Sequence, residues 1–157
     1  MKPRSKKSIQ ALSWAAILLL VVLAGCASAR MDLPKDFLEL EDGKNDFQAV
    51  TADDARIWLR RFSDKNEAPL SFWVGVLEHE FTKQRGYELV KQGEVNAQLG
   101  AGRWFECAAN VRGDRVGYLV GVWANDGDIT VAEFAARAEV FTARVDDVRA
   151  ALATVRR

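Results

Sequence analysis

The chain has 157 residues, of which 49% are hydrophobic and 28% are charged. This length predicts one domain with an apolar core of its own, and the lack of an internal repeat excludes a repeat array. Its 22 Lys and Arg residues match 22 Asp and Glu residues, but four of the basic residues lie in the first eight positions. Removal of that segment leaves 22 minus 4, or 18, basic residues against 22 acidic ones. The resulting net charge of −4 argues against a nucleic-acid-binding protein, which carries a basic face.

The first 25 residues have the composition of a signal peptide. The basic residues of "MKPRSKKS" precede an uninterrupted apolar stretch from Ala15 to Ala24. A bilayer core of about 30 Å needs around 20 apolar residues, so this stretch is too short for a permanent transmembrane helix. We therefore predict that residues 1–25 are a cleaved leader.

The four residues "LAGC", at positions 23–26, resemble the lipobox of bacterial lipoproteins. The resemblance implies cleavage before Cys26, acylation of its thiol and attachment to a membrane. Ala27 in place of Asp resembles the Gram-negative sorting pattern for the outer membrane, facing the periplasm. The alternative is an ordinary secretory signal in which the cysteine is incidental. Residues 26–33 are expected to form a short tether, which holds the domain within a few tens of Å of the lipid.

The next elements are predicted to be three strands and a helix. Turn residues separate short strands at positions 37–40, 46–50 and 55–62. The helix follows because apolar residues then recur at spacings of three and four and a glycine, Gly86, stands where the helix would end. Its apolar stripe consists of Leu70, Trp73, Leu77 and Phe81, widened by Val74.

Four strands and a closing helix complete the chain. The strands are expected as successive hairpins separated by "GAG", "RGD" and "NDGD", and they cover residues 87–95, 103–111, 115–124 and 128–135. The "RGD" sequence is interpreted as a tight turn and not as an adhesion motif. The closing helix is predicted from an amphipathic stripe, made by Phe141, Val145, Val148, Leu152 and Val155.

This order predicts an α+β fold with a mainly antiparallel sheet of six or seven strands and two amphipathic helices packed on it. The order is β-β-β-α-β-β-β-β-α, within a single domain at positions 34–157. The strand at 115–124 is apolar on both sides, so it is expected inside the sheet with helices on both faces. Cys107 alternates in phase with Phe105 and Val111, which predicts a small buried side chain. A reactive or intermolecular thiol is the alternative.

Several segments together resemble the PsbP/DcrB-like and Mog-like α/β sandwich proteins, which include small bacterial lipoproteins. They are "LPKDFLEL", "ARIWLRRF", "LSFWVGVLEHEF", "GYELV", "ITVAEFAA" and "EVFTARVDDVRAAL". The match covers nearly the whole mature chain in element order, although its motifs are unspecific. PsbP-like members are accessory subunits and Mog-like members bind a small GTPase, so the resemblance implies an accessory role without catalysis. No functional residue of the family maps onto this chain position by position.

No catalytic, metal or cofactor motif is found. His79 is the only histidine, and Lys83 stands where a zinc-protease helix would need its second histidine ligand. The chain has neither a nucleophile elbow nor a phosphate-binding glycine loop. We therefore expect a lipid-anchored accessory or binding protein of the cell envelope, with an unnamed envelope protein as its partner. The alternative is an envelope enzyme with a dispersed carboxylate site. That enzyme would need two acids converging in one pocket. Six acids could be imagined as cation ligands, but they lack the spaced oxygen series of an EF-hand loop and are interpreted as turn and solvated-helix residues. They are Asp53, Asp54, Asp126, Asp128, Asp146 and Asp147.

Four residues form a candidate recognition patch. Trp58 and Arg60 project to one side of their strand, and Trp104 and Glu106 project from theirs on the side opposite Phe105. Tryptophan and arginine are enriched at binding hot spots, so these residues could recognise a partner if no helix covers them. The alternative is that they pack in the core beneath a helix.

Overall fold

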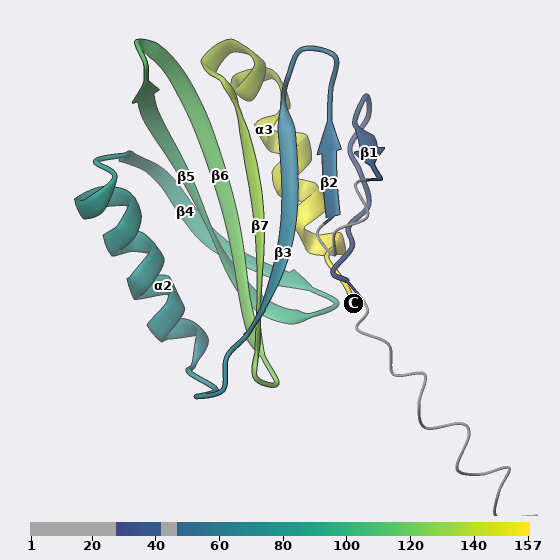
Figure 1. Cartoon of the computed structure of the whole chain (residues 1–157), viewed down its shortest axis with the longest axis vertical. Coiled ribbons are helices and arrows are strands. Elements are labelled where there is room, and N and C mark those ends of the chain that lie inside the picture. Colours follow the sequence, from purple (N-terminus) through teal and green to yellow (C-terminus); the bar gives the residue numbers. More distant parts are fainter. Residues whose placement is uncertain (1–27, 42–46) are drawn as a thin grey trace, which may run out of the picture.

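The computed structural model describes residues 28–41 and 47–157 (Figure 1). The expected signal peptide and Cys26 lie outside these residues. The described elements are β1 (Leu38–Leu40), β2 (Phe47–Val50), β3 (Arg56–Ser63), α2 (Leu70–His79), a π-helical turn η1 (Glu80–Gln84), β4 (Glu88–Ala97), β5 (Gly100–Val111), β6 (Asp114–Asn125), β7 (Asp128–Arg137), α3 (Ala138–Ala151) and a 3₁₀ turn η2 (Leu152–Thr154). All strand pairs are antiparallel, in the order β1-β2-β3-β7-β6-β5-β4. The predicted fold class and element order are confirmed.

The closing helix α3 covers one side of the sheet, which we call the α3 face. Its apolar stripe joins residues from β2, β3, β6 and β7 in the larger buried cluster. The Phe141 ring stacks on Phe134 with centroids 5.1 Å apart, and it lies directly over Gly117. A Cβ atom at Gly117 would come within 2.1 Å of that ring, so the strand is glycine there to admit the aromatic side chain.

Residues 28–33 belong to the domain and not to the tether in which the sequence placed them. Ala29 and Met31 are only 4% exposed and lie in the α3-face cluster. The backbone of Arg30 exchanges two hydrogen bonds with that of Arg156, at 2.8 and 2.9 Å. The prediction was wrong here because this pairing joins the two ends of the chain, and no local pattern reveals such a contact.

The helix α2 and the turn η1 cover part of the opposite side, which we call the α2 face. The predicted stripe of α2 packs on a second buried cluster built from β5, β6 and β7. The last turn widens to a π-helix, since the Arg85 N–H donates to the Glu80 carbonyl at 2.9 Å, and Gly86 then ends the helix with a φ of +66°. Strand β6 is therefore an interior strand with helices above and below it.

Cys107 lies in the α2-face cluster and is 1% exposed, which confirms that it is a buried side chain. Burial raises the pKa of its thiol to about 11, with a smaller contribution from the neighbouring Glu106 carboxylate. A thiol with this pKa stays protonated at neutral pH and is a poor nucleophile.

Two hairpin turns show where the turn prediction succeeded and failed. The "RGD" turn is a two-residue hairpin in which Arg112 and Gly113 both have positive φ, at +54° and +94°. The "GAG" residues, however, lie inside β5, and the turn is formed by the preceding pair, Gln98 and Leu99. Gly102 is required for packing instead, because a Cβ atom there would lie 2.4 Å from the Trp123 indole.

Candidate binding surface

The two faces of the sheet are covered unequally. On the α3 face, the helix and the N-terminal segment close over the strands. On the α2 face, α2 packs on β6 and η1 packs on β4, while β1, β2 and β3 lie beyond the helix (Figure 1). The strand register places three exposed apolar side chains on this uncovered part. They are Leu38, Leu40 and Phe62.

An apolar groove of about 370 Å³ runs between α2 and the β3–β7 pair. We call it the α2 groove. Its lining is formed by Phe62, Ser63, Asp64, Trp73, Val76, Leu77, Val122, Ile129 and Val131. Phe62 is 49% exposed and Val76 is 41% exposed, although both are large apolar side chains next to a core. Exposed apolar surface of this kind, with polar groups at its rim, is typical of a binding site.

Asp64 holds one end of the α2 groove in place. Its carboxylate accepts hydrogen bonds from the backbone N–H groups of Ala68 at 2.8 Å and Asn66 at 3.0 Å, and from the Trp73 indole at 3.3 Å. The same bonds, led by the one from Ala68, hold the pKa of Asp64 below its usual value. These hydrogen bonds hold the loop between β3 and α2 in one conformation, and they fix the Trp73 ring as one wall of the α2 groove.

Two of the predicted patch residues, Trp58 and Arg60, lie on the uncovered part of the α2 face. Arg60 approaches Glu133 on β7 with a nitrogen–oxygen distance of 3.5 Å. The Tyr118 hydroxyl donates a hydrogen bond to the same carboxylate. Burial, followed by the charge of Glu133, raises the pKa of Tyr118 above its usual value. These groups form a polar border beside the α2 groove.

The other two predicted patch residues, Trp104 and Glu106, lie on the α3 face. The Arg149 guanidinium of α3 stacks over the Trp104 ring at 4.7 Å and binds the Glu106 carboxylate at 2.6 Å. The four residues therefore do not form one surface, since the pairs lie on opposite faces of the sheet. For Trp104 and Glu106, the structure shows the core packing beneath a helix that was the alternative interpretation.

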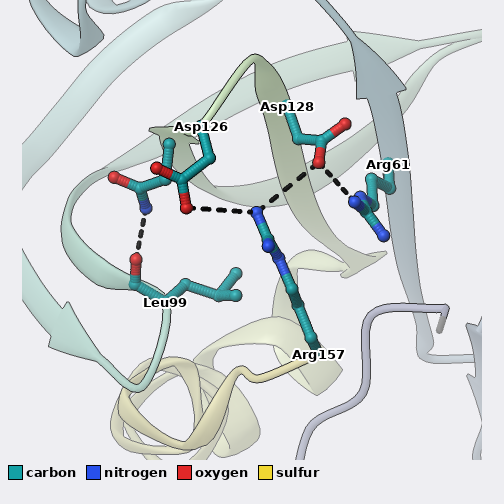
Figure 2. Close-up of polar contacts among 6 residues, drawn as sticks. Arg61, Leu99, Asp126, Asp128 and Arg157 are labelled. Atoms are coloured by element: carbon teal, nitrogen blue, oxygen red, sulfur yellow. Dashed lines mark hydrogen bonds and ion pairs between the residues drawn. The ribbon is translucent and has the colours of Figure 1, made fainter. Parts of the chain in front are cut away.

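Five of the six candidate carboxylates form ion pairs, and the sixth, Asp147, is exposed on α3. Asp53 pairs with Arg144 at 3.0 Å, and Asp146 pairs with Arg149 at 2.7 Å. Figure 2 shows the Arg157 side chain reaching both acids of the β6–β7 turn, Asp126 at 3.8 Å and Asp128 at 3.5 Å, while Arg61 binds the second of them. In the part of the chain that the structure describes, no three His, Cys, Asp or Glu residues lie close enough to hold a metal ion.

His79 is exposed on α2, and its ring lies 3.3 Å from the side-chain nitrogen of Gln84. No helix among residues 28–41 and 47–157 is long and apolar enough to cross a membrane.

Sequence reasoning missed most of the α2 groove. Phe62 alternates with Trp58 and Arg60 along β3, so its side of the strand could have been inferred from the pattern. Glu133 and Asp64 gave no such signal. Their roles depend on the pairing of β3 with β7 and on a loop whose contacts are tertiary.

The sequence matches no protein-family model and no curated protein. Solved structures with a similar fold include the following three. Cyanobacterial PsbP (CyanoP) of Synechocystis sp. PCC 6803 is 11% identical with a TM-score of 0.58, covering 85% of this chain and 94% of its own. LpqN of Mycobacterium tuberculosis, which is involved in cell envelope biogenesis, is 14% identical with a TM-score of 0.59, covering 86% and 88%. PA94 of Pseudomonas aeruginosa, a protein of unknown function, is 15% identical with a TM-score of 0.59, covering 82% and 96%.

The chain therefore has a PsbP-like fold, as the resemblance predicted. At these identities the similarity concerns the fold alone, and function has to be argued from the surface of this chain.

Proposed function

We propose that the protein is a lipid-anchored accessory protein of the cell envelope, which binds an envelope partner in the α2 groove and performs no catalysis itself. The observation that carries this proposal is the unequal cover of one sheet. The α3 face is closed, whereas large apolar side chains such as Phe62 and Val76 remain half exposed along the α2 groove. Full burial of a large apolar side chain contributes about 1.5–3 kcal/mol. Because Phe62 and Val76 are already half buried, binding of a partner would recover about half of this amount at each.

The anchor is the acylated Cys26 implied by the "LAGC" sequence. Two or three acyl chains stabilise membrane attachment by about 0.8 kcal/mol per buried methylene, so the domain needs no amphipathic helix for this purpose. Ala27 supports the outer membrane, facing the periplasm, as its location. The involvement of LpqN in cell envelope biogenesis is compatible with this proposal.

The anchor is tested with Cys26→Ser in cells. This variant should remain as a longer, uncleaved precursor, and it should be absent from the outer-membrane fraction. A variant that is cut and sorted like the wild type would contradict the proposed acylation.

The groove is tested by purifying the tagged, anchored protein from intact membranes after chemical crosslinking. Val76→Glu places a charge in the α2 groove, whereas Ser71→Glu places the same charge elsewhere on the same helix. The first variant should lose the crosslinked partner and the second should keep it. If both variants keep the partner equally, the groove is not its binding site.

A further inference from the structure

The folded domain begins almost at the proposed anchor. Only Ala27 and Ser28 lie between Cys26 and Ala29, which is already buried. The three residue steps from Cys26 to Ala29 span at most about 11 Å, even when fully extended. The backbone pairing of Arg30 with Arg156 then fixes this end of the chain to the body of the domain. An acylated Cys26 would thus hold the domain directly against the lipid headgroups.

The same contacts identify which end of the sheet lies beside the anchor. Arg157 follows the Arg30–Arg156 bridge and reaches Asp126 and Asp128 in the β6–β7 turn (Figure 2). The side chain of Asn125 donates a hydrogen bond to the Leu99 carbonyl in the β4–β5 turn. We call this the anchor end, defined by the Arg30–Arg156 bridge and the turns at 98–99 and 126–127. The "RGD" turn lies at the opposite end of β5, about 36 Å away for a 12-residue strand.

We infer that the anchor end is the membrane-facing surface of the protein and that this end contacts the lipid headgroup layer. This inference rests on the proposed acylation of Cys26. The short link to Cys26 sets the orientation, and electrostatic attraction does not, because the arginines at this end are paired with acids. Arg156 binds Asp32 at 2.8 Å, and Arg157 binds the acids of the β6–β7 turn. Paired charges give this end little net attraction to anionic lipid.

The orientation has a consequence for the α2 groove. Ser63 pairs with Asp128 at the end of the sheet, so the groove residues Phe62 to Asp64 lie in the half of the domain nearer the bilayer. A partner of the groove must therefore reach it close to the membrane surface.

The test uses a chain that begins at Cys26, because both buried clusters lie within residues 29–155 and this chain keeps the whole core. Its Cys26 thiol is coupled to a maleimide-bearing phospholipid in liposomes. Cys107 does not compete, since it is buried and its raised pKa keeps the thiol protonated. Coupling replaces acylation, so a failed orientation is distinguishable from a failed lipoprotein assignment, which Cys26→Ser tests in cells.

A photoreactive amino acid is placed at Gln98 in the anchor end or at Asp114 beside the "RGD" turn, and lipid adducts are counted by mass spectrometry. We expect at least about tenfold more adduct from position 98, because the two sites lie at opposite ends of β5. Insertion of about 40 flexible residues before Ser28 should bring the two positions within about twofold of each other, because a linker with a root-mean-square length of about 35 Å no longer sets the orientation. Equal adducts with the short link would overturn the inference, and so would a bias that survives the insertion.

Discussion

The two faces of the sheet differ in how far their apolar side chains are buried. One face contributes to the stability of the fold, and the other keeps apolar side chains exposed for binding. On the α3 face, Phe141 is 6% exposed and fits over Gly117, with Phe134 stacked beside it. On the α2 face, Phe62 is 49% exposed and lines an apolar groove. The hydrophobic contribution of a phenylalanine to folding is proportional to the area that it buries. Substitution of Phe141 should therefore affect mainly stability, and substitution of Phe62 should affect mainly binding.

The largest expected effect is on the α3 face. Phe141→Ala should lower the free energy of unfolding by about 3–5 kcal/mol, because it removes a buried ring and leaves a cavity over Gly117. The urea midpoint measures the loss. Asp147→Ala on the exposed side of the same helix should shift the midpoint little. Similar, near-zero shifts for both variants would contradict the packing of α3.

A second prediction concerns the ion pair beneath α3. Arg149→Met should cost about 1–3 kcal/mol, since it leaves the Glu106 carboxylate, 8% exposed, without its charged partner. Asp146→Ala removes the other, solvent-exposed partner of Arg149 and should cost much less. Equal unfolding midpoints for these two variants would show that the contact with Glu106 contributes nothing.

The third prediction uses the buried thiol of Cys107 on the α2 face. Its folded pKa is about 11, above the ordinary thiol value, so the unfolded chain loses this proton first as the pH rises. Stability should therefore fall between about pH 9 and 11, by about 1.4 kcal/mol per pH unit at most. Cys107→Ala should cost about 1 kcal/mol at neutral pH and should show a smaller fall with rising pH. Rapid labelling of the native thiol by a bulky reagent would contradict its burial.

The smallest expected effect on stability is at the α2 groove. Phe62→Ala should change the free energy of unfolding by less than about 1 kcal/mol, because half of the ring is already in water. The same variant should weaken partner capture from crosslinked membranes. A loss of stability as large as that of Phe141→Ala would place Phe62 in the core and remove the contrast between the faces.

The sequence was sufficient for the elements and for the buried side of each helix. The spacing of Phe141, Val145 and Val148 selects one helical face whatever the partner strands are. It was not sufficient for contacts between distant segments. The pairing of Arg30 with Arg156 and of Arg60 with Glu133 depends on strand order, which no local pattern specifies.

For the candidate site as well, the sequence predicted local features and missed contacts between distant segments. Alternation placed Trp58 and Arg60 on one side of β3, but it could not show that Trp104 and Glu106 face the opposite helix. That placement depends on the register of β5 with β6 and of β6 with β7. The groove itself exists only because α2 lies over β6 and leaves β3 uncovered.

The most direct test of the central claim is photo-crosslinking in intact envelopes from one position on each face. A photoreactive amino acid replaces Val76 in the α2 groove or Asp147 on the outer surface of α3. The account predicts a discrete protein adduct from position 76 and none from position 147. No adduct from position 76, or equal adducts from the two positions, would contradict it.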